Sequence, residues 1–555
     1  MTSIFHLSDW SYTFLIYAVW GLIPWSWYYT LNHSLRFSLR LLLSNRPFDF
    51  TSFPHLQSLL KFLAQSKSRP SSLLFSYALL EVLFSIYYCY QAKLAQRRIY
   101  QVQHSPEFLR SCILKVVGSG IPPDLGQQLD ASFAESSNQQ RTRLQRPVSP
   151  QTLAPTVALD FHDPHAVDFR SHVVIWFGKC EWEEICRDNF MEWLAWSLFS
   201  VHHHEIRDAA HHELIASLLS VFELRAGAKL PPGYNSRLRP RVMRLTLDPV
   251  KVTSHPIGFY AAVQGLSWMV KRMLIKNGFT ETQCTHRPDG LRYLIRKPDG
   301  WDQAPEKTRS VPFICIHGLG VGFIQYVAFL RYLAHSPWAR SRPVMIPIQP
   351  SISSSSFSSQ HLSPPSKEEM TSDMREVFRK EGFETSGADL FGHSNGTIVA
   401  AWIIKSMPHL VKRVCLVDPV CFCLWEGHVC HNFLYGTPQN GLERLMRYYI
   451  GTELGVAKYL HRHFDWVANI LWPAELPDFK DGNRCSVFLA GRDSVLNAPR
   501  VRKYLLQNGM TEVGTEKGEP GQAAAGLVMA WDAAHGESLI EGHFERIKSW
   551  LERTT

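Results

Sequence analysis

The chain has 555 residues, of which 45% are hydrophobic and 19% charged, and its formal net charge is +9. This length exceeds one ordinary hydrophobic core and this composition excludes a largely disordered chain, so we expect several structured regions. Lysine and arginine are scattered without an aromatic-interleaved basic stripe, which argues against nucleic-acid binding. The 11 cysteines lie mostly inside apolar runs, which indicates buried thiols in a reducing, intracellular compartment. No CxxC pair occurs, and we expect neither a metal site nor a cofactor.

The first predicted element is an uncharged stretch from Trp10 to Leu31. At about 1.5 Å rise per residue, a helix over 10–31 would cross the roughly 30 Å hydrocarbon layer of a bilayer. Tryptophan and tyrosine stand at both of its ends, as in interfacial aromatic belts. Pro24 would kink or shorten the helix, which a membrane helix tolerates. We therefore expect a membrane-spanning helix, with a buried helix of a soluble core as the alternative.

A second apolar stretch, 71–92, contains one charge, Glu81. Because a carboxylate in a bilayer is costly unless it is paired, this stretch would span, lie in the interface, or pack on the first helix as a hairpin. Basic residues flank it on both sides, so the distribution of positive charge does not fix an orientation. They do suit an anionic lipid surface. We interpret 1–118 as a membrane-associated helical region.

Two regions separate this part from the C-terminal half. Residues 119–156 are rich in Gln, Ser and Pro, which predicts a flexible linker. Residues 157–282 are helical in pattern and form a predicted accessory region. Within it, 189–199 reads as an amphipathic helix that would dock on the membrane or on the catalytic domain. The histidine-rich groups 202–205 and 211–213 are interpreted as a solvated or membrane-facing helix rather than a metal site.

Beyond residue 280, predicted strands alternate with predicted helices. We expect a hairpin over 284–296 and strands at 311–316, 344–348, 388–391, 414–417, 486–490 and 527–531. Helices are expected at 366–382, 397–406, after 490, and at the end of the chain on Phe544, Ile547 and Leu551. This alternation predicts an α/β fold, a doubly wound, mostly parallel sheet with right-handed crossovers.

The run Gly392-His393-Ser394-Asn395-Gly396 stands between a predicted strand and a predicted helix. A serine hydroxyl is a poor nucleophile unless it is exposed beside a base, and a tight strand–turn–helix exposes it in this way. Such a turn strains the backbone at the serine, so Gly392 and Gly396 must be small. We predict that Ser394 is a nucleophile.

A nucleophilic serine also needs donors for the oxyanion. The loop His317-Gly318-Leu319-Gly320 follows the strand 311–316, where such a loop is expected. The backbone N–H groups of Leu319 and of Asn395, the residue after the serine, are the predicted oxyanion-hole donors. His317 is expected to shape the loop rather than to transfer protons.

The acid and the base should follow the serine, each just past a strand. Asp493 comes directly after the strand 486–490 and is the preferred acid, while Asp418, after 414–417, is the alternative acid. His535 lies between the last strand and the last helix and is the predicted base. His543 falls inside that helix and is expected to be structural.

On the His317–Gly318 loop, the Gly392–Gly396 turn, Asp493 and His535, the region 283–555 resembles the α/β-hydrolase superfamily of serine esterases and lipases. The resemblance implies that Ser394 attacks an acyl carbonyl, His535 relays the proton and Asp493 holds the imidazole. It also implies that the aromatic, helical stretch 419–483 is a lid, and an apolar lid favours an apolar acyl chain. The N-terminal additions and an insertion at 511–525 depart from compact members of the family.

These observations predict a membrane-anchored serine hydrolase that cleaves a carboxylic ester of a lipid or another hydrophobic acyl compound. Its expected partners are that substrate and membrane lipid, with no nucleic acid. A thioesterase or an acyltransferase would use the same residues. The alternative from another class is a membrane scaffold or binding protein with a hydrolase-like domain. The complete set of Ser394, Asp493 and His535 argues against it, because a non-catalytic module has no need of all three.

Overall fold

The computed structural model describes residues 8–45, 72–99, 103–121, 158–238, 242–513, 526–540 and 542–553. Among them, eight strands form one sheet in the order β1-β2-β4-β3-β5-β6-β7-β8. Strands β1 and β2 run antiparallel to their neighbours and the others are parallel, so the predicted mostly parallel sheet is confirmed. The strands are β1 Thr280–Gln283, β2 Arg292–Arg296, β3 Phe313–Ile316, β4 Val344–Ile348, β5 Ala388–His393, β6 Val411–Val417, β7 Cys485–Ala490 and β8 Leu527–Ala530.

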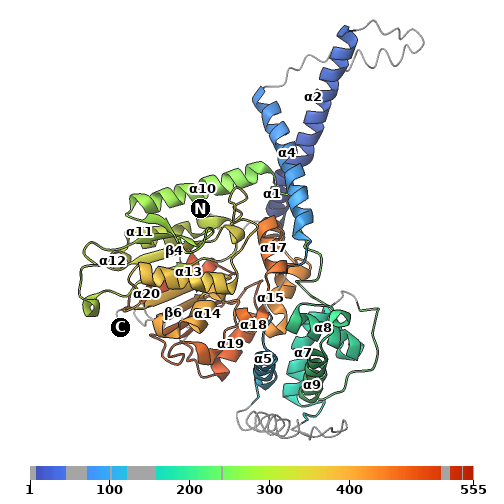
Figure 1. Cartoon of the computed structure of the whole chain (residues 1–555), viewed down its shortest axis with the longest axis vertical. Helices are drawn as coiled ribbons and strands as arrows, with labels where there is room; N and C mark the ends of the chain where they lie inside the picture. The colour runs from blue at the N-terminus through green and yellow to red at the C-terminus, as the bar shows by residue number, and fades with distance from the viewer. Residues whose placement is uncertain are drawn as a thin grey trace.

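Helices cover both faces of this sheet (Figure 1). One face packs against α10 (Ile257–Lys276), α11 (Val327–His335), α12 (Pro337–Arg340) and α20 (Phe544–Leu551). The other packs against α13 (Lys367–Lys380), α14 (Gly396–Ser406) and α19 (Ala498–Gln507). Burial on both faces explains why the central strands are continuous apolar runs. The helix α13 begins as its sequence predicts, at a capping box formed by Ser366 and Glu369.

A second group of helices packs beside the sheet: α5 (Pro106–Gly118), α7 (Pro164–Val173), α8 (Arg187–Phe199) and α9 (Ala209–Ala226) (Figure 1). The amphipathic pattern predicted for 189–199 is wrong, whereas the predicted docking on the C-terminal half is confirmed, since Trp466 Nε1 donates to the carbonyl of Ser197 (2.8 Å). Both sides of α8 are buried, because large apolar side chains follow one another along it with no continuous polar face. The predicted linker and the 511–525 insertion lie almost entirely outside the described residues.

The predicted single helix over 10–31 is also wrong. The chain forms α1 (Asp9–Trp20) and α2 (Leu22–Asn45), separated at Gly21. Pro24 has no N–H to donate to the carbonyl of Trp20, so the hydrogen-bond ladder is broken there. The helix α1 packs on α16 (Gly441–Met446), whereas α2 and α4 (Ser72–Ala95) pack on each other and project from the rest of the molecule (Figure 1).

Among the described residues, α4 is the helix that is long and apolar enough to cross a membrane. It covers the second predicted stretch, 71–92. Its one carboxylate, Glu81, is buried and faces the protein: it accepts a hydrogen bond from the N–H of Ile257 (2.9 Å), the first residue of α10. Negative charge is favourable at a helix N-terminus. The charge that makes this stretch look unsuitable for lipid therefore caps a neighbouring helix.

A second buried carboxylate, Glu453, joins three parts of the fold. It stands at the start of α17 (Leu454–Arg462), where it accepts a hydrogen bond from the N–H of Val456 (3.0 Å). Tyr260 of α10 donates its hydroxyl (2.8 Å), and His361, from the loop before α13, lies 2.9 Å away through Nε2. Burial alone would raise the pKa of Glu453, but His361 and these hydrogen bonds lower it to about 2. The carboxylate thus stays charged inside the protein.

Candidate active site

Ser394 occupies the sharp turn between β5 and α14. Its φ of 51° lies in the left-handed region, which costs energy for a residue with a Cβ atom. A Cβ atom on Gly396 would lie 2.3 Å from the carbonyl oxygen of Ile316, and one on Gly392 would lie 3.1 Å from the carbonyl oxygen of Gly396. Glycine at both positions lets the turn close tightly enough to present the serine, as the sequence pattern predicts.

The structure brings Ser394, His535 and Asp493 into one hydrogen-bonded chain. His535 Nε2 lies 2.9 Å from Ser394 Oγ, and His535 Nδ1 lies 2.6 Å from Asp493 Oδ2. The other carboxylate oxygen of Asp493 accepts hydrogen bonds from the N–H groups of Val495 (2.7 Å) and Leu496 (3.0 Å). With one oxygen fixed by backbone donors, Asp493 orients the imidazole through the other.

Asp418, the alternative acid, lies beside these three residues, but its carboxylate accepts hydrogen bonds from backbone N–H groups. Its Oδ1 accepts from the N–H of Ala490 (2.9 Å) and its Oδ2 from the N–H of Gly536 (2.7 Å). Its own φ of 45° is left-handed. Burial, followed by the nearby charge of Asp493, raises the pKa of Asp418. Both carboxylate oxygens are thus used to hold the end of β7 and the loop that carries His535.

Burial by itself lowers the pKa of His535, because it disfavours the imidazolium ion. The charge of Asp493, its hydrogen bond to Nδ1 and the charge of Asp418 outweigh burial and raise this pKa to about 9. The pair of carboxylates therefore stabilises positive charge on the imidazole next to Ser394.

The loop from His317 to Gly320 lies against the serine, since a Cβ atom on Gly318 would be 2.8 Å from Ser394 Cβ. Within the described residues, the N–H groups of Leu319 and Asn395 donate to no acceptor, whereas the N–H groups of Gly318 and Gly320 each donate to one. Two free donors beside the serine are the arrangement that an oxyanion needs.

Two side chains that the sequence did not single out hold this loop in place. Tyr326 Oη accepts the N–H of Gly318 (2.7 Å) and forms a hydrogen bond with Nδ1 of His393 (2.7 Å). Both side chains are buried. The only sequence signal for His393 was its place inside the glycine–serine turn. His317 is also buried, which lowers its pKa to about 4 and leaves a neutral ring that packs in the loop.

Ser394 and His535 open on a cavity of about 480 Å³. Its wall is almost entirely apolar, and half of its lining residues come from 419–483, the stretch expected to form a lid. This stretch contains α15 (His428–Cys430), a π-helical turn η10 (His431–Tyr435), α16, a second π-helical turn η11 (Arg447–Gly451), α17 and α18 (Trp466–Asn469). Two wall residues come from outside the sheet domain and this stretch: Leu15, on α1, and Leu245, in the accessory region.

Among the described residues, possible metal ligands gather at one place away from Ser394, His535 and the two aspartates. Donor atoms of His172, Glu426 and His428 lie within 4.8 Å of one another. Glu426 already has a cation, because Arg500 Nη2 lies 2.7 Å from its carboxylate. We assign no metal there. The histidine-rich stretch begins with His202, whose Nδ1 lies 2.7 Å from a carboxylate oxygen of Glu192.

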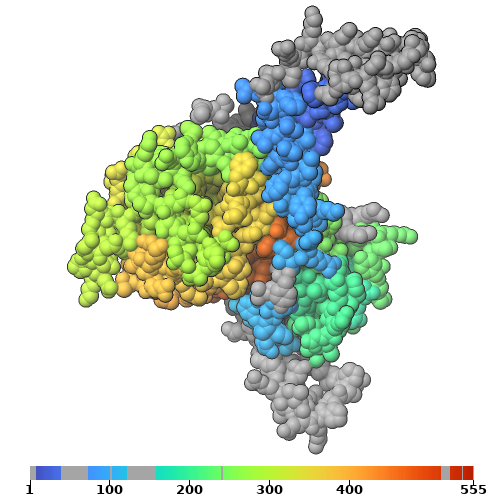
Figure 2. Space-filling view, turned by 45° about the horizontal axis from the view of Figure 1, so that its top comes forward, coloured from blue at the N-terminus to red at the C-terminus, as the bar shows by residue number. Residues whose placement is uncertain are grey.

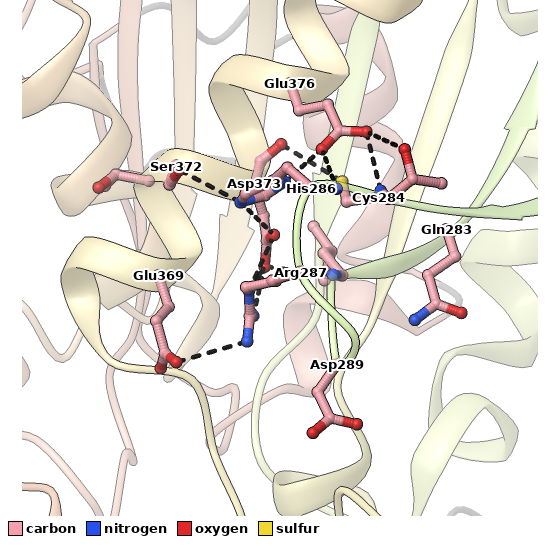
Figure 3. Close-up of polar contacts among 12 residues, drawn as sticks. Gln283, Cys284, His286, Arg287, Asp289, Glu369, Ser372, Asp373 and Glu376 are labelled. Atoms are coloured by element: carbon pink, nitrogen blue, oxygen red, sulfur yellow. Dashed lines mark hydrogen bonds and ion pairs between the residues drawn. The ribbon is translucent and has the colours of Figure 1, made fainter.

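Another dense cluster of titratable side chains lies where the turn between β1 and β2 meets α13 (Figure 3). Arg287 Nη2 lies 2.5 Å from Asp373 Oδ2, and His286 pairs with Glu376. Burial alone would raise the pKa of Glu376, but hydrogen bonds from Thr285 and His286 lower it to about 2. Burial raises the pKa of Cys284 to about 12, so its thiol is a poor nucleophile. The cluster fastens the hairpin to the helix.

No protein-family model and no curated protein matches the sequence. Among solved structures, the chain is similar to an α/β-hydrolase enzyme from the sediment metagenome of the Mar Chica lagoon, Morocco (17% identity, TM-score 0.28, 48% of this chain and 95% of that one). It is also similar to carboxylesterase CesB from Bacillus subtilis (13%, 0.31, 52% and 96%). A third is a membrane phospholipase A described as a novel bacterial virulence factor (16%, 0.33, 53% and 93%). These structures are described as an α/β-hydrolase enzyme, a carboxylesterase and a phospholipase A, and each match covers about half of this chain.

Proposed function

We propose that this protein is a membrane-associated serine hydrolase that cleaves a carboxylic ester with a long apolar acyl chain. The observation that carries the proposal is the hydrogen-bonded chain from Asp493 through His535 to Ser394, which ends in an apolar cavity. A polar relay at the wall of an otherwise apolar cavity suits a substrate with one reactive carbonyl and a hydrocarbon tail.

In the proposed mechanism, Ser394 Oγ attacks the ester carbonyl while His535 Nε2 takes the hydroxyl proton. Asp493 keeps the proton on Nδ1 and stabilises the imidazolium ion. The N–H groups of Leu319 and Asn395 donate to the oxyanion. His535 then protonates the leaving alcohol, and an acyl–Ser394 ester remains. Water, deprotonated by His535, attacks this ester and releases the carboxylic acid and free Ser394.

Residues 419–483 are proposed as the lid of this site. The apolar side chains of this stretch form much of the cavity wall, and closing it over the serine would exclude water from the reacting carbonyl. Breaks into short helices and two π-helical turns suit a segment that changes shape around an acyl chain, because π-helical turns frequently occur at functional sites.

The helices α2 and α4 are proposed as the membrane attachment. They project as a hairpin, and the outward side of α4 carries exposed leucines, isoleucine and tyrosines. A bilayer would cover that apolar surface. Extraction of membranes with alkaline carbonate tests this proposal: the protein should stay in the membrane pellet, and full release would contradict it.

Labelling with a fluorophosphonate probe tests the catalytic proposal. The probe phosphonylates an activated serine, so the wild-type protein should be labelled and Ser394→Ala should not. Ser351→Ala, which alters a buried serine that does not line the cavity, is the matched control and should be labelled like the wild type. Absence of Ser394-dependent labelling in folded protein would favour the scaffold alternative.

The raised pKa of His535 predicts the pH dependence of ester hydrolysis. Only the neutral imidazole accepts the serine proton, so kcat/KM should rise with pH as His535 loses its proton. With a pKa of about 9, this rise should be centred well above the ordinary histidine value of 6.5. Rates measured on a soluble ester between pH 5 and 10 test this. A midpoint at or below 6.5 would contradict the electrostatic role of the two carboxylates.

A further inference from the structure

Leu15 is the residue of α1 that lines the cavity. Its side chain is 39% exposed, so the same residue belongs to the cavity wall and to the surface of the protein. Residues of α16, on which α1 packs, and of the turn η11 also line the cavity, including Met446 and Tyr449. The cavity therefore reaches the outside of the molecule at the seam between α1 and the proposed lid.

Specific contacts hold α1 in this seam. Asp9 accepts the N–H of Gly441 (2.8 Å), the first residue of α16, and pairs with Arg444 (3.2 Å). At the other end of the seam, Tyr449 Oη donates to the backbone carbonyl of Leu15 (3.3 Å). A few polar contacts thus attach the helix to the proposed lid. When the lid moves, these contacts either break or move α1 together with the lid.

The opposite side of α1 presents an aromatic stripe, formed by Trp10, Phe14 and Tyr17. These side chains are 84%, 75% and 66% exposed, and their spacing of four and three residues puts them on one face of the helix. Exposed aromatic rings in a row are costly in water, and Trp and Tyr favour the interface between lipid headgroups and hydrocarbon. One side of α1 therefore lines the cavity, and the other presents aromatic side chains that suit a lipid–water interface.

The surroundings of α1 identify that interface as a bilayer. The helix lies at the foot of the α2–α4 hairpin (Figure 1), and α4 runs directly beside α10 on the face shown in Figure 2. The outward side of α10 exposes Leu266, Trp268 and Met269, and its last turns carry Arg272 and Lys276. An apolar helix face that ends in basic side chains suits hydrocarbon bordered by anionic headgroups.

From these contacts we infer that the acyl chain enters the cavity directly from the bilayer, between α1 and the segment formed by α16 and η11. This inference rests on the proposed ester hydrolysis at Ser394. The aromatic stripe would seat α1 at the lipid interface, with Leu15 at the entrance of the cavity. A substrate of this site is then an ester whose acyl chain already lies in the membrane, and it reaches the serine without crossing water.

The test compares two esters with the same leaving group in the full-length protein bound to phosphatidylcholine vesicles. One is 4-methylumbelliferyl oleate, incorporated in the vesicles, and the other is 4-methylumbelliferyl butyrate, dissolved in the buffer. The stripe variant carries Trp10→Ser, Phe14→Ser and Tyr17→Ser. Its matched control carries Val167→Ser and Tyr234→Ser, two exposed apolar side chains of the accessory region. Rates are expressed per enzyme bound, as measured by vesicle flotation.

The stripe variant should hydrolyse the vesicle oleate at least tenfold more slowly than the control, while its butyrate rate and fluorophosphonate labelling stay within twofold. Leu15→Trp, which adds bulk at the entrance, should lower the ratio of oleate to butyrate hydrolysis at least tenfold. An unchanged oleate rate in the stripe variant, or an equal fall for both esters, would overturn entry from the bilayer. Absence of Ser394-dependent labelling in the wild type would instead overturn the proposed function itself.

Discussion

Replacing Asp493 with asparagine is expected to lower kcat for a soluble ester by about 10⁴-fold, the scale known for loss of the acid of a serine triad. Asp493 accepts the Nδ1 proton of His535 at 2.6 Å, and an asparagine offers an amide instead of a charge. Without the carboxylate, the imidazolium ion is destabilised and the ring can turn to the unproductive tautomer. Steady-state rates with 4-methylumbelliferyl butyrate measure the loss.

Asp418→Asn is the matched comparison. Asp418 binds the N–H groups of Ala490 and Gly536 and does not contact the imidazole, so this variant should lose roughly 10- to 100-fold through misplacement of His535. The pH profile separates the two roles, because Asp493→Asn should also move the acid limb to lower pH. A larger loss in Asp418→Asn than in Asp493→Asn would make Asp418 the acid.

Glu453→Ala is expected to lower the free energy of unfolding by about 3–5 kcal/mol, the cost of removing one partner of a buried ion pair. The substitution leaves Tyr260, His361 and the N–H of Val456 without their shared acceptor. Thermal unfolding in detergent solution measures the effect. The midpoint should fall by several degrees, since α10, α17 and the loop before α13 all lose a contact.

Glu453→Gln provides the control for shape. Its carbonyl oxygen can still accept from Tyr260, so it should be less destabilising than alanine. The charge of Glu453 is retained down to a pKa of about 2, so the wild-type advantage over the glutamine variant should be present above the unfolded value of about 4.5. It should shrink as the pH falls from there toward 2. An alanine variant within 1 kcal/mol of the wild type would contradict this role.

The sheet could be predicted from the sequence because each signal was local. Val344–Ile348 reads as a continuous apolar run, and the glycines around Ser394 mark a turn that few other residues permit. The geometry then joined residues that are far apart in the chain: 141 positions separate Ser394 from His535. Strand order alone pointed to this pairing, since the carboxyl ends of parallel strands meet at one edge of a sheet.

What the sequence missed depends on partners distant in the chain. Glu81 looks like a misplaced charge in an apolar helix until α10 places an N–H beside it. Leu15 is one apolar residue in a run of many, and nothing local marks it as part of a cavity wall. Pro24 is a local cause of the division at Gly21. A proline at this position, however, is compatible with one kinked helix as well as with two separate helices. Only the packing of α1 on α16 distinguishes them.

The seating of α4 on α10 has a practical consequence for producing the protein. Besides the cap from Glu81, Tyr88 donates to the carbonyl of Thr253 (2.7 Å) and Gln96 exchanges two hydrogen bonds with the backbone of Val250. A shortened protein that starts after α5 would lose all of these partners and expose the apolar side of α10. Removal of the hairpin to gain solubility would thus expose part of the interior of the sheet-containing half. Purification of the intact chain in detergent or lipid discs is the sounder route to crystals and kinetics.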